Sequence, residues 1–189
     1  MAQKIRLTDE GGTVQLHIGD GKLSLHKGDI LTLKADALVC PVDQKFSLNS
    51  GLARIVSHAA GQQISQEKPQ THESFGKVVV FPGGKLNVKY IFMTVLMGEK
   101  DPEKMKRVIQ QAVDRTIRYA EFLRLKSIAF PLLGSAEVSP PFEAVAKYMM
   151  EEVNQYFHRR RTKIEAVLFS AINPTAYQAF CKEAKNISE

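Results

Sequence analysis

The chain has 189 residues, of which 44% are hydrophobic and 24% are charged, a composition typical of soluble globular proteins. This composition excludes a disordered tail, a collagen and a coiled coil. The 26 Lys and Arg residues exceed the 20 Asp and Glu residues and give a net charge of +6, which is compatible with an anionic ligand but does not identify one. A chain of this length predicts one domain whose core needs no disulfide or metal.

Residues that form disulfides or bind metals are few and scattered. Cys40 and Cys181 make no disulfide framework, and the 5 histidines show no ligand spacing, so we expect no metal and no cofactor. The N-terminal segment has no apolar signal core, and the longest apolar stretch, at 90–97, is too short to span a membrane. These features predict a cytoplasmic protein without membrane contact.

In the first third of the chain, alternating runs at 14–18 and 23–26 predict two strands joined by a Gly-Asp-Gly-Lys turn. The apolar run at 36–40 is bounded by polar residues and suits a buried strand. Apolar positions at helical spacing then predict a helix that begins after Ser50, its N-cap, and stops at Gly61.

The polar stretch 62–76 predicts a loop. Strands are expected at 77–81 and 90–95, joined by a turn that contains Pro-Gly-Gly. The clearest helix in the chain is predicted at 103–125, opened by an Asp-Pro pair, and a strand at 127–131 follows it.

The last third of the chain predicts a loop at 132–140, a helix at 141–157, a strand at 164–170 and a helix at 174–184. Strands that alternate with helices of this length indicate an α/β protein, namely a three-layer α/β/α sandwich with a mixed, largely parallel sheet. The chain shows no internal repeat and no linker, and we interpret residues 1–189 as a single domain.

Ligands of such folds bind beyond the carboxyl ends of the strands, where loops lead into helices. Three segments are expected there: 28–30, 40–52 and 132–140. The last two each lead into a helix N-terminus, whose free N–H groups and dipole favour anions. Every α/β fold has such corners, so this position alone does not identify the ligand.

The order of several segments resembles the macro domain, an ADP-ribose-binding family. The segment 27–61 is similar to the family's GDIT-like turn, DAIVNAAN-like strand, glycine-rich loop and helix ending in AAG. Its sequence is KGDILTLKADALVCPVDQKFSLNSGLARIVSHAAG. GKVVVFPGGKLNVKYIFMTV at 76–95 looks like its paired strands, and LKSIAFPLLGSAEVSPPFEAVAKYMMEEV at 125–153 like its strand, phosphate loop and helix. VLFSAINPTAYQAF resembles the closing strand and helix. The resemblance covers about residues 22–185, which leaves 1–21 as an N-terminal extension with an added strand.

The resemblance implies that Asp29 occupies the position of the acid that reads adenine, assisted by the backbone of Ile30. A carboxylate accepts a hydrogen bond from an exocyclic amine, which favours adenine over guanine. The alternative interpretation is that Asp29 only caps a turn.

The chain departs from the family pattern in the next segment. Both asparagines of the NAAN stretch are missing, and Asp43 stands where the second one contacts the distal ribose. The glycine-rich loop retains one glycine, and its implied ligand-binding residues are Asn49, Ser50, Gly51 and Leu52. Family members that hydrolyse ADP-ribose linkages carry an acid where this chain has Ala53, which performs no acid–base chemistry.

The second phosphate loop has also diverged. Its implied binding residues are Gly134, Ser135, Ala136, Glu137 and Val138, whose backbone N–H groups would hold a diphosphate. Glu137 would oppose the diphosphate if it points inward, whereas an outward orientation makes it an ordinary surface residue. The family's aromatic residue after the last strand falls here on Ala171 or Ile172, so no stacking platform is expected at that position.

Three functions are compatible with these features. We favour a module that binds ADP-ribose or a related adenine nucleotide, free or protein-linked, without hydrolysing it. The first alternative is an ADP-ribosyl or ADP-ribose-1''-phosphate hydrolase. The second is a module that has lost ADP-ribose binding and binds a protein or RNA, the latter through the basic cluster Arg159–Arg161, which otherwise stays solvated at a helix end.

Overall fold

The computed structural model describes residues 6–10, 13–134, 140–159 and 162–188. The described strands form one eight-stranded mixed sheet in the order β1-β2-β3-β8-β7-β4-β6-β5. The strands are β1 (Arg6–Glu10), β2 (Thr13–Ile18), β3 (Gly21–Lys27), β4 (Ala37–Asp43), β5 (Val78–Pro82), β6 (Tyr90–Met97), β7 (Ser127–Pro131) and β8 (Ala166–Ala171). The helices are η1 (Ile30–Thr32), α1 (Gly51–Ala60), α2 (Gln63–Glu67), α3 (Pro102–Phe122), α4 (Phe142–Arg159) and α5 (Pro174–Ser188).

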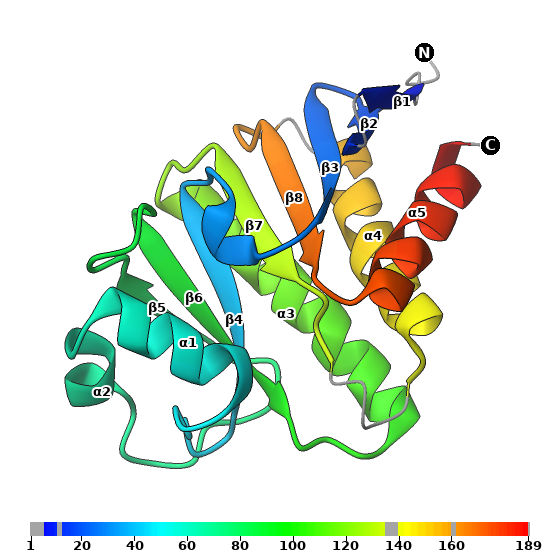
Figure 1. Cartoon of the computed structure of the whole chain (residues 1–189). Helices are drawn as coiled ribbons and strands as arrows, with labels where there is room; N and C mark the ends of the chain where they lie inside the picture. Colours follow the sequence, from blue (N-terminus) through cyan, green and yellow to red (C-terminus); the bar gives the residue numbers. More distant parts are fainter. Residues whose placement is uncertain (1–5, 11–12, 135–139, 160–161, 189) are drawn as a thin grey trace.

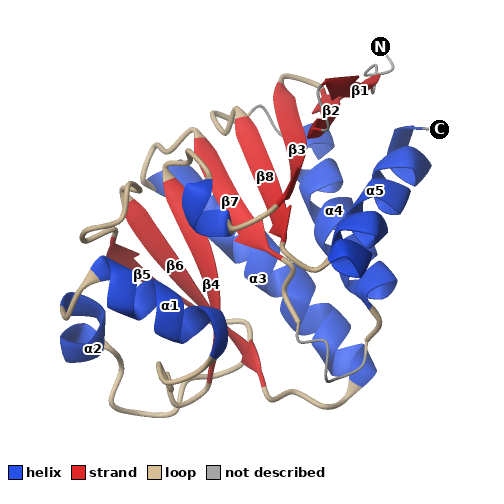
Figure 2. Cartoon of the chain, in the orientation of Figure 1, coloured by secondary structure: helices blue, strands red, loops and turns tan. Residues whose placement is uncertain are grey.

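Helices cover the sheet on both faces. Helices α3, α4 and α5 lie behind the sheet in Figures 1 and 2, whereas α1, α2 and the short η1 lie in front of it. Each side has its own hydrophobic core, a larger one with α3–α5 and a smaller one with α1 and α2. The predicted three-layer α/β/α sandwich with a mixed sheet is therefore confirmed.

Strand β4 shows how the sequence divides its apolar residues between the two cores. Ala37 and Val39 are fully buried in the larger core, and Leu38, Cys40 and Val42 are buried in the smaller one. Successive side chains of a strand point to opposite faces, so a strand covered on both sides reads as a continuous apolar run. This is why DALVC is recognisable as a buried strand.

The five central strands, in the order β3-β8-β7-β4-β6, are parallel, and antiparallel pairings occur at the two margins. Their carboxyl ends therefore meet at one edge of the sheet, which is the lower edge in Figure 1, and their amino ends meet at the upper edge. The first edge carries the connections to η1, α1, α4 and α5. It is the edge at which this class of fold binds ligands.

The structure corrects three details of the predicted elements. The N-terminal segment contributes β1 as well as the predicted β2, and the two pair in antiparallel fashion. The stretch predicted as a loop at 62–76 contains the short helix α2, whose Ile64 is buried in the smaller core. Helix α3 ends at Phe122 and not at Leu125, because Arg124 adopts a left-handed backbone with φ of 57°.

The far end of α1 is attached to the β5–β6 turn. Gly84 lies so close to that helix end that a Cβ atom on it would stand 2.2 Å from the carbonyl oxygen of Ala60, and its φ is +60°. The neighbouring Lys85 N–H donates to the same oxygen at 3.0 Å. Only glycine tolerates both the approach and the backbone conformation, so this turn sets the position of α1 along the sheet.

Candidate functional site

A crevice of about 420 Å³ opens at the carboxyl edge of the sheet, between α1 on one side and the starts of α4 and α5 on the other. Its described walls come from segments that are far apart in the sequence and meet here because the central strands are parallel. They are Gly28, Asp29, Ile30, Gly51, Leu52, Ile55, Pro131, Leu132, Gly134, Phe142, Ser170, Ala171, Ile172, Asn173 and Ala176. Asp29 is the one residue with a formal charge among these described lining residues.

Asp29 follows the end of β3 and forms the N-cap of η1. Its Oδ1 accepts a hydrogen bond from the Leu31 N–H at 2.9 Å, and its carbonyl oxygen accepts one from the Thr32 hydroxyl at 2.7 Å. The side chain is nevertheless exposed at the crevice. Asp29 therefore does cap a turn, as the alternative interpretation of the sequence proposed. The cap uses only Oδ1, and Oδ2 of Asp29 makes no hydrogen bond to any described residue.

The backbone next to Asp29 is fastened to the neighbouring strand β8. The Ser170 hydroxyl donates to the Gly28 carbonyl oxygen at 2.7 Å, and the Gly28 N–H donates to the Ala171 carbonyl oxygen at 3.1 Å. Ile30 is buried and packs in the smaller core. Asp29 is therefore held between two anchored residues, which fixes its position at the rim.

Asp43 lies at the end of β4 but is not among the described residues that line the crevice. Its Oδ1 accepts hydrogen bonds from the N–H groups of Lys45 and Ser47, both at 2.9 Å. Burial alone would raise the pKa of Asp43, but the hydrogen bonds from Ser47 and Lys45 outweigh it and lower the pKa below its ordinary value. The carboxylate stays ionised and closes its own turn.

The turn after Asp43 is anchored by Phe46. This side chain is fully buried in the smaller core, although its backbone has a φ of 52°, which is unusual for a residue other than glycine. The burial of an aromatic ring offsets the backbone strain. The sequence does not single out Phe46, because nothing in the pattern marks it as more than one apolar residue in a loop.

The start of α1 contributes part of the predicted set to the crevice. Gly51 and Leu52 line it, whereas Asn49 and Ser50 are not among its described lining residues. Ser50 is the N-cap of α1 as predicted, although its side chain makes no capping hydrogen bond. Gly51 has a φ of 54° and open space where a Cβ would stand, so the glycine is required by the backbone turn.

The second predicted loop is described only in part. Gly134, with a φ of 142°, lines the crevice, and the predicted residues Ser135, Ala136, Glu137 and Val138 lie outside the described residues. The chain is described again from Pro140 onward, and α4 begins at Phe142. Of the basic cluster, the side chain of Arg159 and all of Arg160 and Arg161 also lie outside the described residues.

Several crevice residues were not predicted. Ile55 is 49% exposed and Phe142 is half-buried, and both present apolar surface to the crevice. Phe142 is an aromatic wall at the start of α4, and the sequence pattern identifies it only as part of a core helix. Ile172, one of the two positions considered after β8, is 73% exposed at the rim, whereas Ala171 is buried.

Asn173 is a further crevice residue without a predicted role. Its Oδ1 accepts from the N–H groups of Thr175 at 2.8 Å and Ala176 at 3.3 Å, so the side chain caps α5. The pair Asn-Pro just ahead of an apolar helix is a recognisable capping signal. The first N–H groups of α5 are thus already satisfied by the protein.

Cys40 and His58 do not contribute reactive groups to the crevice. Cys40 is fully buried, and this burial raises the pKa of its thiol to about 12, so the thiolate nucleophile is not available. His58 is exposed on α1. Within the described ranges no three His, Cys, Asp or Glu side chains gather as a metal site requires. None of the described helices combines the length and the apolar composition needed to cross a membrane.

Comparisons with known proteins agree with this architecture. The model of the Macro domain family matches residues 39–149, which is more than half of the chain. An uncharacterized protein of Sulfurisphaera tokodaii is 26% identical over 159 residues, covering 82% of this chain and 86% of that protein. The ADP-ribose glycohydrolase MACROD1 of Mus musculus is 23% identical over 154 residues, covering 78% of this chain and 46% of that protein.

The solved structures show the same fold. The Oceanobacillus iheyensis macrodomain, crystallised with ADP, superposes with a TM-score of 0.83 at 17% identity and covers 96% of this chain and 97% of that one. A glycine-to-valine variant of the same macrodomain, crystallised with ADP-ribose, gives a TM-score of 0.82 at 17% identity and covers 93% of this chain and 98% of that one. The chain belongs to the Macro domain family, which confirms the resemblance derived from its ordered segments.

Proposed function

We propose that this macro domain binds ADP-ribose or a related adenine nucleotide in the crevice at the carboxyl edge of its sheet. The observation that carries the proposal is the crevice itself, which combines one acid, apolar walls and backbone groups at a topological edge that favours nucleotides. The ADP and ADP-ribose complexes of the Oceanobacillus iheyensis macrodomain support the choice of ligand.

Each part of the crevice suits one part of such a ligand. Asp29 offers Oδ2 to the exocyclic amine of adenine at one end. The side chains of Ile55, Ile172 and Phe142 offer apolar surface to the base and the sugar. The diphosphate would lie near Gly51 and Gly134, where the backbone has positive φ angles and no Cβ keeps an anion away from the N–H groups.

We further propose that binding proceeds without hydrolysis. Hydrolytic family members carry an acid at the position that is Ala53 in this chain, and the methyl side chain of Ala53 is buried. Asp43 is engaged by two backbone N–H groups within its own turn, so its carboxylate is not placed to activate water above the crevice. Neither residue supplies the general base that hydrolysis requires.

Isothermal titration calorimetry with ADP-ribose, ADP and AMP tests the proposal. We expect saturable binding of ADP-ribose and ADP at one site per chain. Ile55→Glu places a negative charge on an exposed crevice position and should weaken binding at least about tenfold through like-charge repulsion. Tyr119→Glu is the matched control, because Tyr119 is 43% exposed on α3, outside the described lining of the crevice, and should change affinity little.

The absence of heat at millimolar ligand would contradict the binding proposal, as would equal effects of the two variants. Hydrolysis is tested separately by incubating the protein with ADP-ribosylated substrates of several linkage types. We expect no release of ADP-ribose. Release that is lost in Asp43→Asn would contradict the non-hydrolytic part of the proposal and leave the binding part intact.

A further inference from the structure

The amino edge of the sheet, opposite to the crevice, carries a row of lysines. Each of the five parallel strands has a lysine at its start or within a few residues before it. In the order of the sheet, β3-β8-β7-β4-β6, these residues are Lys22, Lys163, Lys126, Lys34 and Lys89. We call this surface the lysine edge.

Hydrogen bonds hold the strand starts side by side. The N–H of Lys22 donates to the Glu165 carbonyl oxygen at 2.9 Å, and the N–H of Glu165 donates to the Lys126 carbonyl oxygen at 2.7 Å. The N–H of Lys126 donates to Asp36 Oδ2 at 2.7 Å, and the N–H of Lys89 donates to the Asp36 carbonyl oxygen at 2.8 Å. With adjacent strands about 4.8 Å apart, the row spans about 19 Å.

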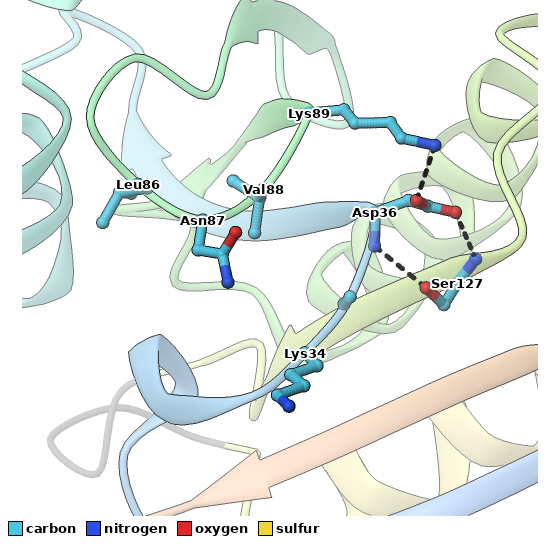
Figure 3. A pocket seen from close by; sticks show the side chains of 8 residues that line it. Lys34, Asp36, Leu86, Asn87, Val88, Lys89 and Ser127 are labelled. Carbon is cyan, nitrogen blue, oxygen red and sulfur yellow. Dashed lines mark hydrogen bonds and ion pairs between the residues drawn. The ribbon is translucent and has the colours of Figure 1, made fainter.

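Two hollows open along the lysine edge. One of about 490 Å³ is lined by Lys34, Asp36, Lys89 and Ser127 together with the 86–88 segment. Figure 3 shows Lys89 reaching to Asp36 at the start of β4, with Lys34 on the segment that leads into that strand. The other hollow, of about 300 Å³, lies beside it, because its lining includes Lys126, the chain neighbour of Ser127.

Positive charge exceeds negative charge along this edge. The five lysines and the described lining of the two hollows together hold six cations, which are the five lysines and Arg124, and three carboxylates, which are Asp20, Asp36 and Glu165. Lys89 pairs with Asp36 and Lys126 pairs with Glu165. Both lysines remain accessible, since their side chains are 64% and 67% exposed. The pair between Lys126 and Glu165 is exposed on both sides and is therefore weak, so a phosphate can replace that carboxylate as the partner of Lys126.

Two exposed aromatic residues lie in the last turns of α3, the helix that leads into β7 at the lysine edge. Phe122 ends α3, two residues before Arg124, and is 82% exposed, and Tyr119 on the preceding turn is 43% exposed. Such exposure of a phenylalanine leaves a large apolar surface in water. A flat ring beside a row of cations is the combination that binds unstacked bases together with their phosphates.

We propose that the lysine edge binds single-stranded nucleic acid, with the lysines on successive phosphates and Phe122 stacked on a base. This function is independent of nucleotide binding in the crevice. Strand β4 has seven residues, so the two edges are about 23 Å apart along it. Both ligands can therefore be bound at once.

Fluorescence anisotropy with a labelled single-stranded oligouridylate RNA of about twelve nucleotides tests the proposal at two salt concentrations. We expect saturable binding at about 50 mM salt that weakens steeply at about 200 mM, because phosphate contacts release counterions. The triple variant Lys34→Gln, Lys126→Gln, Lys163→Gln should lose at least about tenfold in affinity and show a smaller salt slope. Phe122→Ala should weaken binding several-fold while leaving the salt slope unchanged.

A triple variant with the same net charge serves as the control. Lys104→Gln, Lys147→Gln, Lys182→Gln removes lysines from α3, α4 and α5, and should bind RNA almost as well as the original chain. Equal losses in the two triple variants, salt-insensitive binding or no binding at the lower salt concentration would overturn the proposal. Competition by saturating ADP-ribose would also overturn it, because it would place the RNA in the crevice.

Discussion

Asp29 accepts a backbone hydrogen bond with one carboxylate oxygen and also lines the crevice. Its Oδ1 caps η1 through the Leu31 N–H. Because each oxygen of a carboxylate accepts independently, the cap does not compete with a ligand that approaches Oδ2. The structural and the functional interpretations of this residue are therefore compatible, which the sequence alone did not reveal.

Asp29→Asn separates the two roles. Its amide oxygen preserves the cap, and its NH2 group replaces the Oδ2 that we propose accepts from the amine of adenine, so a donor would face a donor. We expect an unchanged melting temperature and about tenfold weaker binding of ADP, as for the loss of a hydrogen bond to a charged group. We also expect the original chain to prefer ADP over IDP, which lacks the amine, and Asp29→Asn to lose this preference.

Asp114→Asn is the control for this measurement, because Asp114 pairs with Arg118 on the surface of α3. An unchanged ADP affinity in Asp29→Asn would show that the acid serves only as a cap. A lower melting temperature together with weaker binding would instead indicate that the substitution disturbed η1.

At the scale of elements, the sequence predicted what depends on local patterns. The turn at Gly19 and the start of α3 at Asp101 follow from short signals, and both are observed. Helix α2 and the bend at Phe46 depend on burial against residues distant in the chain, which a local pattern does not contain. The same distinction applies to the residues that line the crevice. Sequence motifs identified Asp29 and Gly51 as candidate binding residues, whereas only the fold shows that Phe142 lines the crevice.

Asp36 joins three strand starts at the amino edge. Its carboxylate accepts from the N–H groups of Lys126 and Ser127 and pairs with Lys89 Nζ at 2.9 Å, while its own N–H donates to the Ser127 hydroxyl at 2.9 Å. Burial alone would raise the pKa of Asp36, but the hydrogen bonds from Lys89, Lys126 and Ser127 and the charge of Lys89 outweigh it and lower the pKa.

Asp36→Asn should reduce the free energy of unfolding at pH 7 by about 1–3 kcal/mol, because it removes charge-assisted hydrogen bonds at three strands. The pKa is lower in the folded state than in the unfolded state, so this stabilisation is complete above the unfolded value. It is lost as the pH falls through the folded value. Urea unfolding at pH 7 and pH 3 should show a difference between the two proteins that shrinks at pH 3.

The pH series has its own control. Asp114→Asn, in an exposed pair, should cost less than about 0.5 kcal/mol at either pH. A difference between the original chain and Asp36→Asn that is equally large at pH 3 and pH 7 would mean that the side chain acts by its shape and not by its charge.

For the whole molecule, the net charge of +6 is unevenly placed. The described lining of the crevice contains no Lys or Arg, whereas the lysine edge gathers six cations among its described residues. The edges are about 23 Å apart along β4, more than twice the Debye length of about 8–10 Å near physiological salt. The lysine edge and its hollows thus carry a net charge of +3, half of the chain's +6, whereas the described lining of the crevice carries only the negative charge of Asp29.

This separation predicts different salt responses for the two surfaces. The affinity for ADP-ribose should change by less than about threefold between roughly 50 and 300 mM salt, because in the proposed binding mode the phosphates meet backbone dipoles and not side-chain cations. Titration calorimetry over this range measures it. A decrease of about tenfold or more would indicate that a cation takes part in the crevice.

The two hydrophobic cores have a consequence for motion. Helix α1, one wall of the crevice, packs on the smaller core, and α4 and α5, the opposite wall, pack on the larger one, with the sheet between them. We therefore expect α1 to open at the expense of the smaller core, so that its backbone amides exchange with solvent without global unfolding. A molecule that bridges the crevice would contact both α1 and the starts of α4 and α5. It would thereby couple the opening of α1 to the opening of the opposite wall.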